Sequence, residues 1–585
     1  MEKRAADSIS WQAWSNDLFA QAKSEDKPVF LYLQAPWCQW CRRLESESLT
    51  DPQICLLINR YFIPLRVDSD ERPDINLRYT MGGWPSIAIL TPDGEIITGG
   101  TFLNREDLKK LLTHCLLLYR EHRKELRSRL RQAKKRASHH VGDRTTEETG
   151  LSLDIVHKVL EFLSADFDPI YGGFGREPKF PHYEAIELAL CAARLFSDST
   201  MEEIATRTLD GMAEGELFDR EEGGFFRLAQ KRDWSAPQTE KMLVDNAWLL
   251  HNYLDGWLVC GQEKYRDIAR SVARYLDTHL YDPGRSVFFP SQRADEEYYR
   301  LSRAERKFFP PPSPQKTIYT DWNALAVSAF LKASAVFEEE SYLERARKTL
   351  AFLWQHCFTQ DAGMLHAAGF PPDTSFRLLA DQIYMARALL DTYQILGEEA
   401  YLSSASLLAQ LIHRNFSDEQ GGFWDRTDTD KPCGRLRERI KPILDNALAA
   451  EFFLKLGILD QNPEYLAIAR HTLAFFSQDF PRYGIFASHY ALACYLLLQP
   501  AVLVIILGRQ TDQTTRHFLG KAFALSEPRK IIKLLELDQH PQMLQMLQQQ
   551  GYKAPRGYLY LGQDCLLETD DIEHLVDTVR GLAGK

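Results

Sequence analysis

Cysteine is scarce in this chain. The sequence has 10 cysteines in 585 residues, and most stand alone in apolar stretches, as Cys191, Cys260 and Cys494 do. A disulfide framework needs many paired cysteines in an oxidising compartment, so this usage argues against a disulfide-stabilised secreted fold. Cys38 and Cys41 are a close pair, and in a reducing compartment a close pair indicates chemistry.

Long apolar runs and an excess of basic charge are also lacking. The apolar run at 501–507 is far shorter than a bilayer span, and the residues that follow Met1 contain no apolar segment of the secretory type. The net charge of −11 argues against a general nucleic-acid binder. We therefore expect a cytoplasmic protein with no membrane partner and no nucleic-acid partner.

Material for hydrophobic cores is abundant, at 45% hydrophobic and 11% aromatic residues. A chain of this length corresponds to about four ordinary domains. Residues 1–117 alternate strand and helix patterns, with compact apolar runs at 29–33, 62–67 and 86–90 that predict strands. This part of the chain is predicted to be a small α/β domain.

The motif Cys38-Gln-Trp-Cys41 directly follows the first predicted strand and opens a helix. Cys38 then lies at a helix N-terminus, where unpaired amides and the helix dipole favour the thiolate. Cys38 is the predicted nucleophile and Cys41 the resolving thiol of a thioredoxin-like domain. Pro85, in Gly82-Gly-Trp-Pro85, is the candidate for the cis-proline that shapes the substrate groove of such a domain.

Two other interpretations of the thiol pair were weighed, a zinc site and an inert pair. A structural zinc site needs four ligands, and one cysteine pair with no second pair or nearby histidine supplies two. We favour the redox interpretation and expect no metal and no cofactor. Trp37, Trp40 and Trp84 are predicted to line the substrate groove.

An internal repeat organises residues 151–499. An apolar residue, a short polar turn and Gly-Gly-Phe recur at 172–174, 223–225 and 421–423, with degenerate copies at 281–288, 358–365 and 480–486. Each copy follows an amphipathic segment and precedes a more uniformly apolar one, the pattern of an outer helix followed by an inner helix. Six such pairs predict an all-α (α/α)6 barrel.

Two further segments complete the predicted organisation. Residues 118–150 begin as a basic helix and end in a polar, turn-rich stretch, which we interpret as a connector rather than an RNA contact because the whole chain is acidic. Residues 500–585 are predicted to form a small α/β appendage, with strands at 502–507 and 530–535 and helices at 513–524 and 570–582.

In the predicted barrel, four inner helices would begin with an aspartate and ring one opening with carboxylates. Such a polar rim with aromatic neighbours suits sugar hydroxyls. The predicted ligand-binding residues are Lys179, His182, Glu240, Lys241, Asp245, Asp321, Trp322, Asn323, Asp381 and Asp445. Aspartate is also a preferred helix N-cap, so we favour helix capping as the main role of these aspartates, ahead of ligand binding and catalysis.

The sequence singles out no catalytic pair in the barrel. Glycoside hydrolysis needs two carboxylates about 5–10 Å apart, which spacing along the chain does not reveal. Epimerisation needs paired bases, commonly histidines, and His182 and His489 are the histidines near predicted inner-helix starts. Neither has a clear partner in the sequence.

Several separate motifs, in order along nearly the whole chain, resemble the spermatogenesis-associated protein 20-like family. They are Trp37-Cys-Gln-Trp-Cys41, Arg72-Pro-Asp74, Gly82-Gly-Trp-Pro85, Gly172-Gly-Phe-Gly175, Pro178-Lys-Phe-Pro181, Glu240-Lys-Met-Leu243 with Asp245-Asn246, and Asp321-Trp-Asn323. The resemblance implies a thioredoxin-like domain fused to a six-hairpin glycosidase-like barrel, similar to N-acylglucosamine 2-epimerase barrels.

The chain departs from that family at identifiable positions. Gln39 and Arg42 stand where the family's thiol motif has histidines, and Gln238 and Thr239 replace a His-Phe pair. Tyr560 stands where the family has a cysteine, which leaves Cys565 alone. The chain is therefore identified as a divergent member.

Three functions follow as hypotheses. The first is a thiol–disulfide oxidoreductase acting with protein thiol clients or a reductase, whose barrel binds a carbohydrate or a client. The second is a sugar-active enzyme, epimerase-like or glycosidase-like, with an auxiliary thioredoxin-like domain. The third is a noncatalytic binding scaffold gated by the thiol pair.

Overall fold

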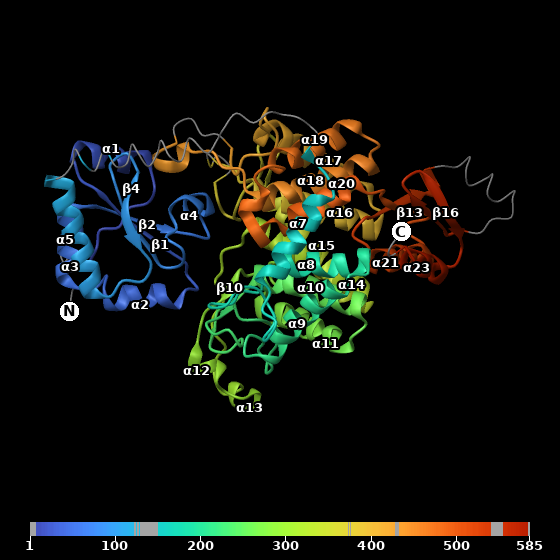
Figure 1. Cartoon of the computed structure of the whole chain (residues 1–585), viewed down its shortest axis with the longest axis horizontal. Helices are drawn as coiled ribbons and strands as arrows, with labels where there is room; N and C mark the ends of the chain where they lie inside the picture. Colours follow the sequence, from blue (N-terminus) through green and yellow to red (C-terminus); the bar gives the residue numbers. More distant parts are fainter. Residues whose placement is uncertain are drawn as a thin grey trace. The chain divides into compact units, whose positions relative to one another are not determined.

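The computed structural model describes residues 8–121, 125, 128, 150–371, 374, 376–427, 432–539 and 554–582. The chain divides into two compact units (Figure 1). One unit comprises residues 1–145 and 426–440, and the other comprises residues 146–425 and 441–585. The predicted linker at 118–150 lies largely outside the described residues.

The N-terminal unit is built on a four-stranded sheet in the order β2-β1-β3-β4. The strands are β1 (Val29–Gln34), β2 (Ile63–Asp68), β3 (Ser86–Leu90) and β4 (Ile96–Gly100). β1 pairs parallel with β2 and antiparallel with β3, and β3 pairs antiparallel with β4. The three predicted strands are confirmed, and β1 and β3 are buried along almost their whole length because helices cover both faces.

Five helices accompany this sheet. They are α1 (Asn16–Ser24), α2 (Gln39–Glu47), α3 (Pro52–Tyr61), α4 (Pro73–Tyr79) and α5 (Arg105–Glu121). Asp51 caps α3 by accepting hydrogen bonds from the N–H groups of Gln53 and Ile54, and Pro52 occupies its first turn, where no N–H is needed. Two apolar clusters, one on each face of the sheet, form the core of this α/β domain.

Residues 432–440, which the sequence analysis assigned to the barrel region at 151–499, pack in the N-terminal unit. The buried Arg78 guanidinium donates hydrogen bonds to the carbonyl oxygens of Arg435 at 3.1 Å and Glu438 at 2.6 Å. The Tyr79 hydroxyl accepts from the Arg435 N–H at 2.7 Å. These contacts, with the short helix η3 (Gly434–Arg437), satisfy backbone groups that would otherwise be buried without partners.

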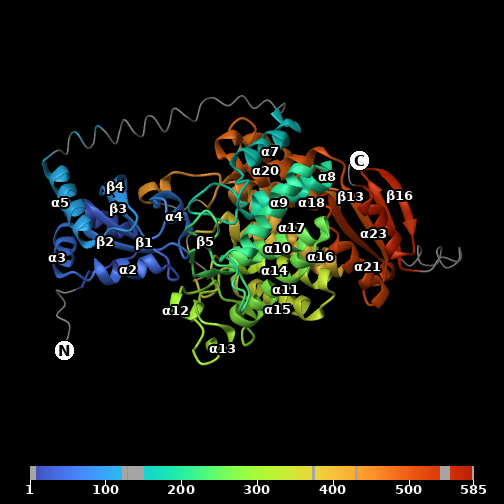
Figure 2. The ribbon, with the colours of Figure 1, turned by 60° about the horizontal axis from the view of Figure 1, so that its bottom comes forward.

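The second unit contains six helical hairpins in its described part, which confirms the predicted barrel (Figure 2). The outer helices are α7 (Asp154–Asp166), α9 (Ser199–Glu214), α11 (Glu263–Tyr275), α15 (Glu340–Cys357), α17 (Glu399–Phe416) and α19 (Pro463–Phe476). The inner helices are α8 (Tyr183–Phe196), α10 (Leu243–Cys260), α14 (Thr320–Phe337), α16 (Leu379–Leu396), α18 (Ile443–Leu459) and α20 (Ser488–Leu498).

Short elements join these hairpins. They are β5 (Leu228–Ala229), β6 (Pro237–Gln238), β7 (Lys241–Met242), η2 (Leu276–Leu280), β8 (Tyr281–Asp282), β9 (Val287–Phe288), β10 (Ser291–Gln292), α12 (Glu296–Tyr299), α13 (Arg303–Arg306), β11 (Phe358–Thr359), β12 (Gly363–Met364) and η4 (Phe480–Ala487).

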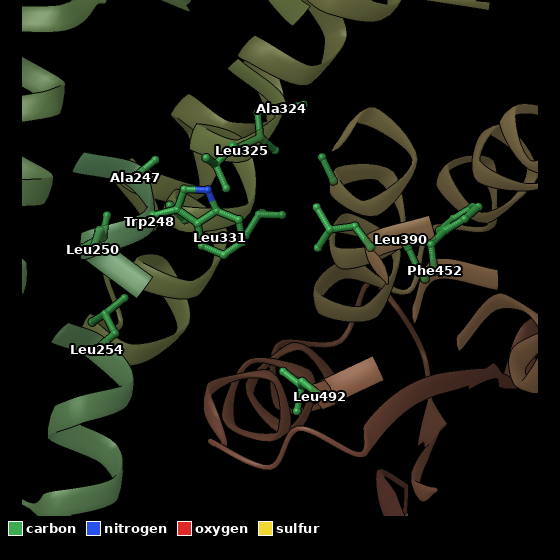
Figure 3. Packing of buried hydrophobic residues seen from close by; sticks show 14 of the residues in the cluster. Ala247, Trp248, Leu250, Leu254, Ala324, Leu325, Leu331, Leu390, Phe452 and Leu492 are labelled. Atoms are coloured by element: carbon green, nitrogen blue, oxygen red, sulfur yellow. The ribbon is translucent and has the colours of Figure 1, made fainter. Parts of the chain in front are cut away.

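The inner helices are buried on nearly all sides, and the outer helices on one side. α14 buries 13 of its 18 residues, whereas α15 buries seven of 18. Inner-helix side chains such as Leu331, Leu390 and Phe452 meet in the core that the hairpins share (Figure 3). A helix that is apolar all round must be enclosed, which is why these sequences form the inner ring.

The Gly-Gly-Phe turns are held by buried side chains that follow them in the chain. Gly224 has a positive φ of 76°, and a Cβ there would meet the Tyr275 ring at 2.5 Å, so only glycine fits. Asn246 then pairs with both backbone groups of Phe225, accepting from its N–H at 2.7 Å and donating to its C=O at 3.0 Å. The same clamp recurs between Asn323 and Phe288, Gln382 and Met364, and Asn446 and Phe423.

The described residues of the C-terminal region, 500–539 and 554–582, form an α/β layer that packs on the barrel. It contains β13 (Val502–Gly508), α21 (Gln513–Ala524), β14 (Lys530–Glu536), η5 (Leu537–Gln539), β15 (Arg556–Leu561), β16 (Asp564–Thr569) and α23 (Ile572–Arg580). Its sheet order is β14-β13-β15-β16, with β13 parallel to β14 and the other pairs antiparallel. This is the strand arrangement of the N-terminal sheet, a repetition that the sequence analysis did not predict.

Candidate functional site

Cys38 is the N-cap residue of α2, as the sequence predicts. Its sulfur accepts a hydrogen bond from the backbone N–H of Cys41 at 3.2 Å. Cys38 is 3% exposed and Cys41 is 1% exposed, and neither forms a disulfide in this structure. The arrangement places Cys38 Sγ at the positive end of a helix, where the backbone N–H of Cys41 points towards it.

Cys41 is the more enclosed member of the pair. Burial raises the pKa of Cys41 strongly, and the hydrogen bond with Cys38 raises it further. Below α2, the Tyr32 hydroxyl donates to Glu45 Oε1 at 3.2 Å, and Glu45 pairs with Arg66 at 2.7 Å. Both thiols are buried, and the position of Cys38 at the helix start is what distinguishes the predicted attacking cysteine from the resolving one.

The three tryptophans predicted to line the groove do not form one group. Trp37 is buried, donates from Nε1 to Asp70 at 2.8 Å, and meets the Trp84 ring edge-on with centroids 5.5 Å apart. Trp40 instead lies against Phe102, 5.2 Å away. The Trp84–Pro85 peptide bond is cis, and Pro85 directly precedes β3.

Asp245, Asp381 and Asp445 do not cap their own helices, so the capping interpretation favoured from the sequence is wrong for these three residues. The N-cap of α10 is Met242, and no side chain caps that helix, because Asp245 lies inside its first turn. Asp381 and Asp445 lie likewise inside the first turns of α16 and α18, which also lack side-chain caps. Helix-start aspartates that do cap, such as Asp198 at α9, stand one position before the helix.

Burial makes several carboxyl groups at the barrel opening weaker acids than usual. It raises the pKa of Glu184, Asp245, Asp321 and Asp445 each to about 7. A helix N-terminus favours the ionised form of a carboxylate, but here the loss of hydration on burial outweighs the helix dipole. Groups that titrate near neutral pH can donate or accept a proton there.

Asp321 and Asp381 lie beside a histidine that the sequence analysis missed. His366 Nδ1 is 3.0 Å from Asp381 Oδ1, and the His366 ring stacks on Tyr319. Ligand atoms of Asp321, His366 and Asp381 all lie within 4.8 Å of one another, close enough to hold one cation. The sequence signal for His366 is its position directly after the turn motif at 358–365. That copy of the motif is degenerate, so the signal was faint.

His489 has carboxylate partners, which the sequence did not reveal. His182 has no charged partner in the described structure. His489 lies between Glu187 at 3.4 Å and Glu451 at 3.7 Å. Burial alone would lower the pKa of His489, but the two carboxylates outweigh it and raise the pKa. His182 is surrounded by aromatic rings, including Phe174 and Phe486, and burial lowers its pKa to about 4.

Three residues predicted to bind a ligand instead hold the fold together. Lys241 is fully buried and donates to Asp219 at 2.7 Å and to the Gly223 carbonyl at 2.7 Å. Lys179 is held in the same way by Asp168 and Gly172, and Asn323 is one of the clamps described above. The hydrogen bonds of these side chains hold the Gly-Gly-Phe turns and their degenerate copies in place. This structural role is seen only in the folded chain.

The remaining predicted residues stay candidates at the opening. Glu240 is 2% exposed, with Arg227 3.7 Å away. Trp322 packs against Tyr319, 5.4 Å between ring centroids, and is partly exposed. The opening is therefore lined mainly by carboxyls of raised pKa, with His366 and Arg227 as its neighbours.

Comparison with known proteins agrees with these features. Residues 1–138 match a family described as a protein of unknown function, DUF255 (Thioredox_DsbH). The alignment with spermatogenesis-associated protein 20 of Homo sapiens shows 24% identity and covers 92% of this chain and 84% of that protein. This chain is a distant relative of spermatogenesis-associated protein 20. The resemblance inferred from the motifs is thereby confirmed.

Part of the chain is similar to sugar epimerases. Cellobiose 2-epimerase of Bacteroides fragilis is 30% identical over 15% of this chain and 22% of its own length. The structure of cellobiose 2-epimerase from Spirochaeta thermophila matches 60% of this chain and 94% of its own, with 17% identity and a TM-score of 0.49. Among the described residues, no helix combines the length and the apolar character needed to cross a membrane.

Proposed function

We propose that the N-terminal unit is a thiol–disulfide oxidoreductase, with Cys38 attacking and Cys41 resolving. The observation that carries the proposal is the position of Cys38 Sγ at the start of α2, 3.2 Å from the Cys41 N–H. Partial positive charge at a helix start stabilises a thiolate, which is the nucleophile in disulfide exchange. The match of residues 1–138 to a thioredoxin-like family supports the same chemistry.

In the reducing direction, the Cys38 thiolate attacks one sulfur of a client disulfide, and the other client sulfur leaves and takes up a proton. Cys41 then loses its proton and attacks Cys38 Sγ, which releases the second client thiol. Two electrons have passed to the client, and Cys38 and Cys41 are joined in a disulfide. A dithiol reductase is then needed as a partner, in keeping with the reducing, cytoplasmic compartment that we propose.

The test is an alkylation titration of the reduced protein against pH, with Cys38→Ser as the control, followed by equilibration with glutathione buffers. We expect Cys38 to react as a thiolate at or below neutral pH and the pair to form a reversible disulfide. A Cys38 that reacts like free cysteine, with no Cys38–Cys41 disulfide, would sink the proposal. That outcome would leave the scaffold hypothesis for this unit.

A second function, acid–base chemistry on a carbohydrate, is favoured by the barrel opening. There, burial raises the pKa values of Asp245 and Asp321 to about 7, and His366 Nδ1 lies 3.0 Å from Asp381 Oδ1. Proton donors and acceptors matched to neutral pH are what epimerisation and glycoside hydrolysis both require. Partly exposed Trp322 is a stacking surface for a sugar ring.

A screen of neutral disaccharides by NMR would test this second function, because epimerisation and hydrolysis give distinct anomeric signals. Asp321→Asn and His366→Gln should each abolish turnover, whereas Cys38→Ser should leave it unchanged. Turnover that survives both substitutions would place the chemistry elsewhere. Binding without turnover would favour a carbohydrate-binding scaffold.

A further inference from the structure

The inner helices enclose a second polar chamber, at the ends opposite to the barrel opening. It has a volume of about 150 Å³ and is lined from every inner helix, by residues that include Glu187, Asp255, Lys332, Asp391 and Lys455. None of the carboxyls of the opening, such as Asp321 and Asp445, lines it. At about 30 Å³ per water molecule, the chamber has room for about five waters or one small solute.

The C-terminal α/β layer forms one wall of this chamber. The residues between α21 and β14 complete its wall, with Ser526 donating to Asp255 at 3.1 Å and Lys530 reaching inwards. Gln394, near the end of α16, accepts from the Ile532 N–H at 3.0 Å. Arg194, near the end of α8, donates to the Val579 carbonyl at 3.2 Å. Residues 523–530 therefore contribute part of the chamber wall.

The walls carry both signs of charge in balance. Lys332 pairs with Asp255 at 2.5 Å, and Lys455 pairs with Glu451 at 2.7 Å. Arg387 lies 3.5 Å from Glu451. Lys332, Lys455 and Arg387 are thus already paired with carboxylates, so these groups offer little net field to a free ion.

Other groups on the wall have hydrogen-bonding capacity to spare. Glu187 Oε2 and Arg387 Nη1 are buried and make no hydrogen bond in the described structure, although each lies within ion-pairing distance of one partner, His489 at 3.4 Å and Glu451 at 3.5 Å. Asp391 accepts from the Ser328 hydroxyl at 2.7 Å, and no cation lies within ion-pairing distance of it in the described part of the chain. Lys530 donates to the backbone carbonyls of Phe523 and Leu525, and burial lowers its pKa to about 7. Unsatisfied polar atoms around a cavity are costly unless something fills it.

We propose that this chamber is a binding site for a neutral, polyhydroxylated small molecule no larger than one monosaccharide ring. A hydroxyl both donates to carboxylates and accepts from ammonium groups, so it satisfies a wall of alternating sign. A phosphate or a bare cation would meet repulsion from half of that wall. The inference stands on the cavity and on the buried polar atoms of its wall that make no hydrogen bond, and does not depend on either function proposed above.

Ligand-observed NMR on the full chain tests the proposal, with D-glucose and myo-inositol as neutral probes and glucose 6-phosphate as the charged comparator. We expect saturation with a Kd of about 1 mM or tighter for a neutral probe, and no binding of the phosphate. Asp391→Asn should weaken binding about tenfold, since it removes a charged acceptor while keeping the shape. Ser328→Ala, a smaller change, should weaken it about threefold and covers the case in which Asp391→Asn does not fold.

Asp321→Asn, at the barrel opening, is the matched control and should leave this binding unchanged. Loss of binding in Asp321→Asn with no loss in Asp391→Asn and Ser328→Ala would assign the sugar to the opening and overturn the proposal. Absence of saturation by both neutral probes at about 10 mM would overturn it too, and would identify the contents of the chamber as water. Preferential binding of the phosphate would contradict the charge argument.

Discussion

Asp512 occupies in the C-terminal sheet the place that Cys38 occupies in the N-terminal sheet. Cys38 follows β1, precedes α2 and accepts from the N–H three residues on, at Cys41. Asp512 follows β13, precedes α21 and accepts from the N–H three residues on, at Thr515, at 2.9 Å. The C-terminal layer thus has a thioredoxin-like strand arrangement in which a capping carboxylate and a hydroxyl replace the thiols.

This equivalence predicts that a thiol pair can be installed. In a Cys38→Ser, Cys41→Ser background, the double substitution Asp512→Cys, Thr515→Cys should form an intramolecular disulfide under mild oxidation, because the N-cap geometry brings the two side chains together. Mass spectrometry with and without reductant measures it. The single variant Asp512→Cys is the control, and full alkylation of both new thiols after oxidation would refute the equivalence.

Cys41→Ser should trap clients. Without a resolving thiol, the mixed disulfide between Cys38 and a client persists. One half of a small-molecule disulfide, or a client protein, should therefore remain attached to Cys38 of the variant. Non-reducing electrophoresis and mass spectrometry of the tryptic peptide measure the adduct. Cys38→Ser should give none, and equal adducts on the two variants would mean that Cys41 also attacks.

Lys241→Met should cost about 3 kcal/mol of unfolding free energy, because it leaves Asp219 buried with one cation fewer. Arg306, 2.7 Å from Asp219, remains and keeps the cost at the lower end of the range for a broken buried pair. Chemical denaturation followed by circular dichroism measures the change. Lys158→Met breaks an exposed pair with Glu161 and should cost less than about 0.5 kcal/mol, so equal effects would contradict the assigned structural role.

The acidic opening should make stability fall as pH rises. Asp445 has its pKa raised by burial to about 7 in the folded chain, above the value near 4 of an unfolded chain, so the folded state holds its proton more tightly. Its contribution is fully present below about pH 4 and is lost as the pH rises through about 7.

Asp445→Asn should therefore flatten the decline in unfolding free energy between about pH 4 and pH 8, by roughly 2–4 kcal/mol. Denaturant melts at both pH values measure it. Glu161→Gln, at an exposed site, should leave the decline as it is. An Asp445→Asn variant that declines as steeply as the parent would show that Asp445 is ionised in the fold.

The sequence by itself determined the elements and their order. A Cys-x-x-Cys pair after an apolar strand fixed the thiol site at the start of α2, because helix periodicity and strand length are local properties. The alternation of amphipathic and uniformly apolar segments likewise determined which helices are outer and which are inner, since a helix apolar all round must be enclosed.

Only the tertiary structure decided what the polar residues of the barrel do. Lys241 and Asn323 look like binding residues in the sequence, yet distant turns bury and occupy them. His366 and Asp381 are 15 residues apart and meet only when their hairpin closes. Hydration, and with it the pKa of Asp245 or Asp445, depends on how many neighbours the fold places around a carboxyl, a quantity that no local pattern encodes.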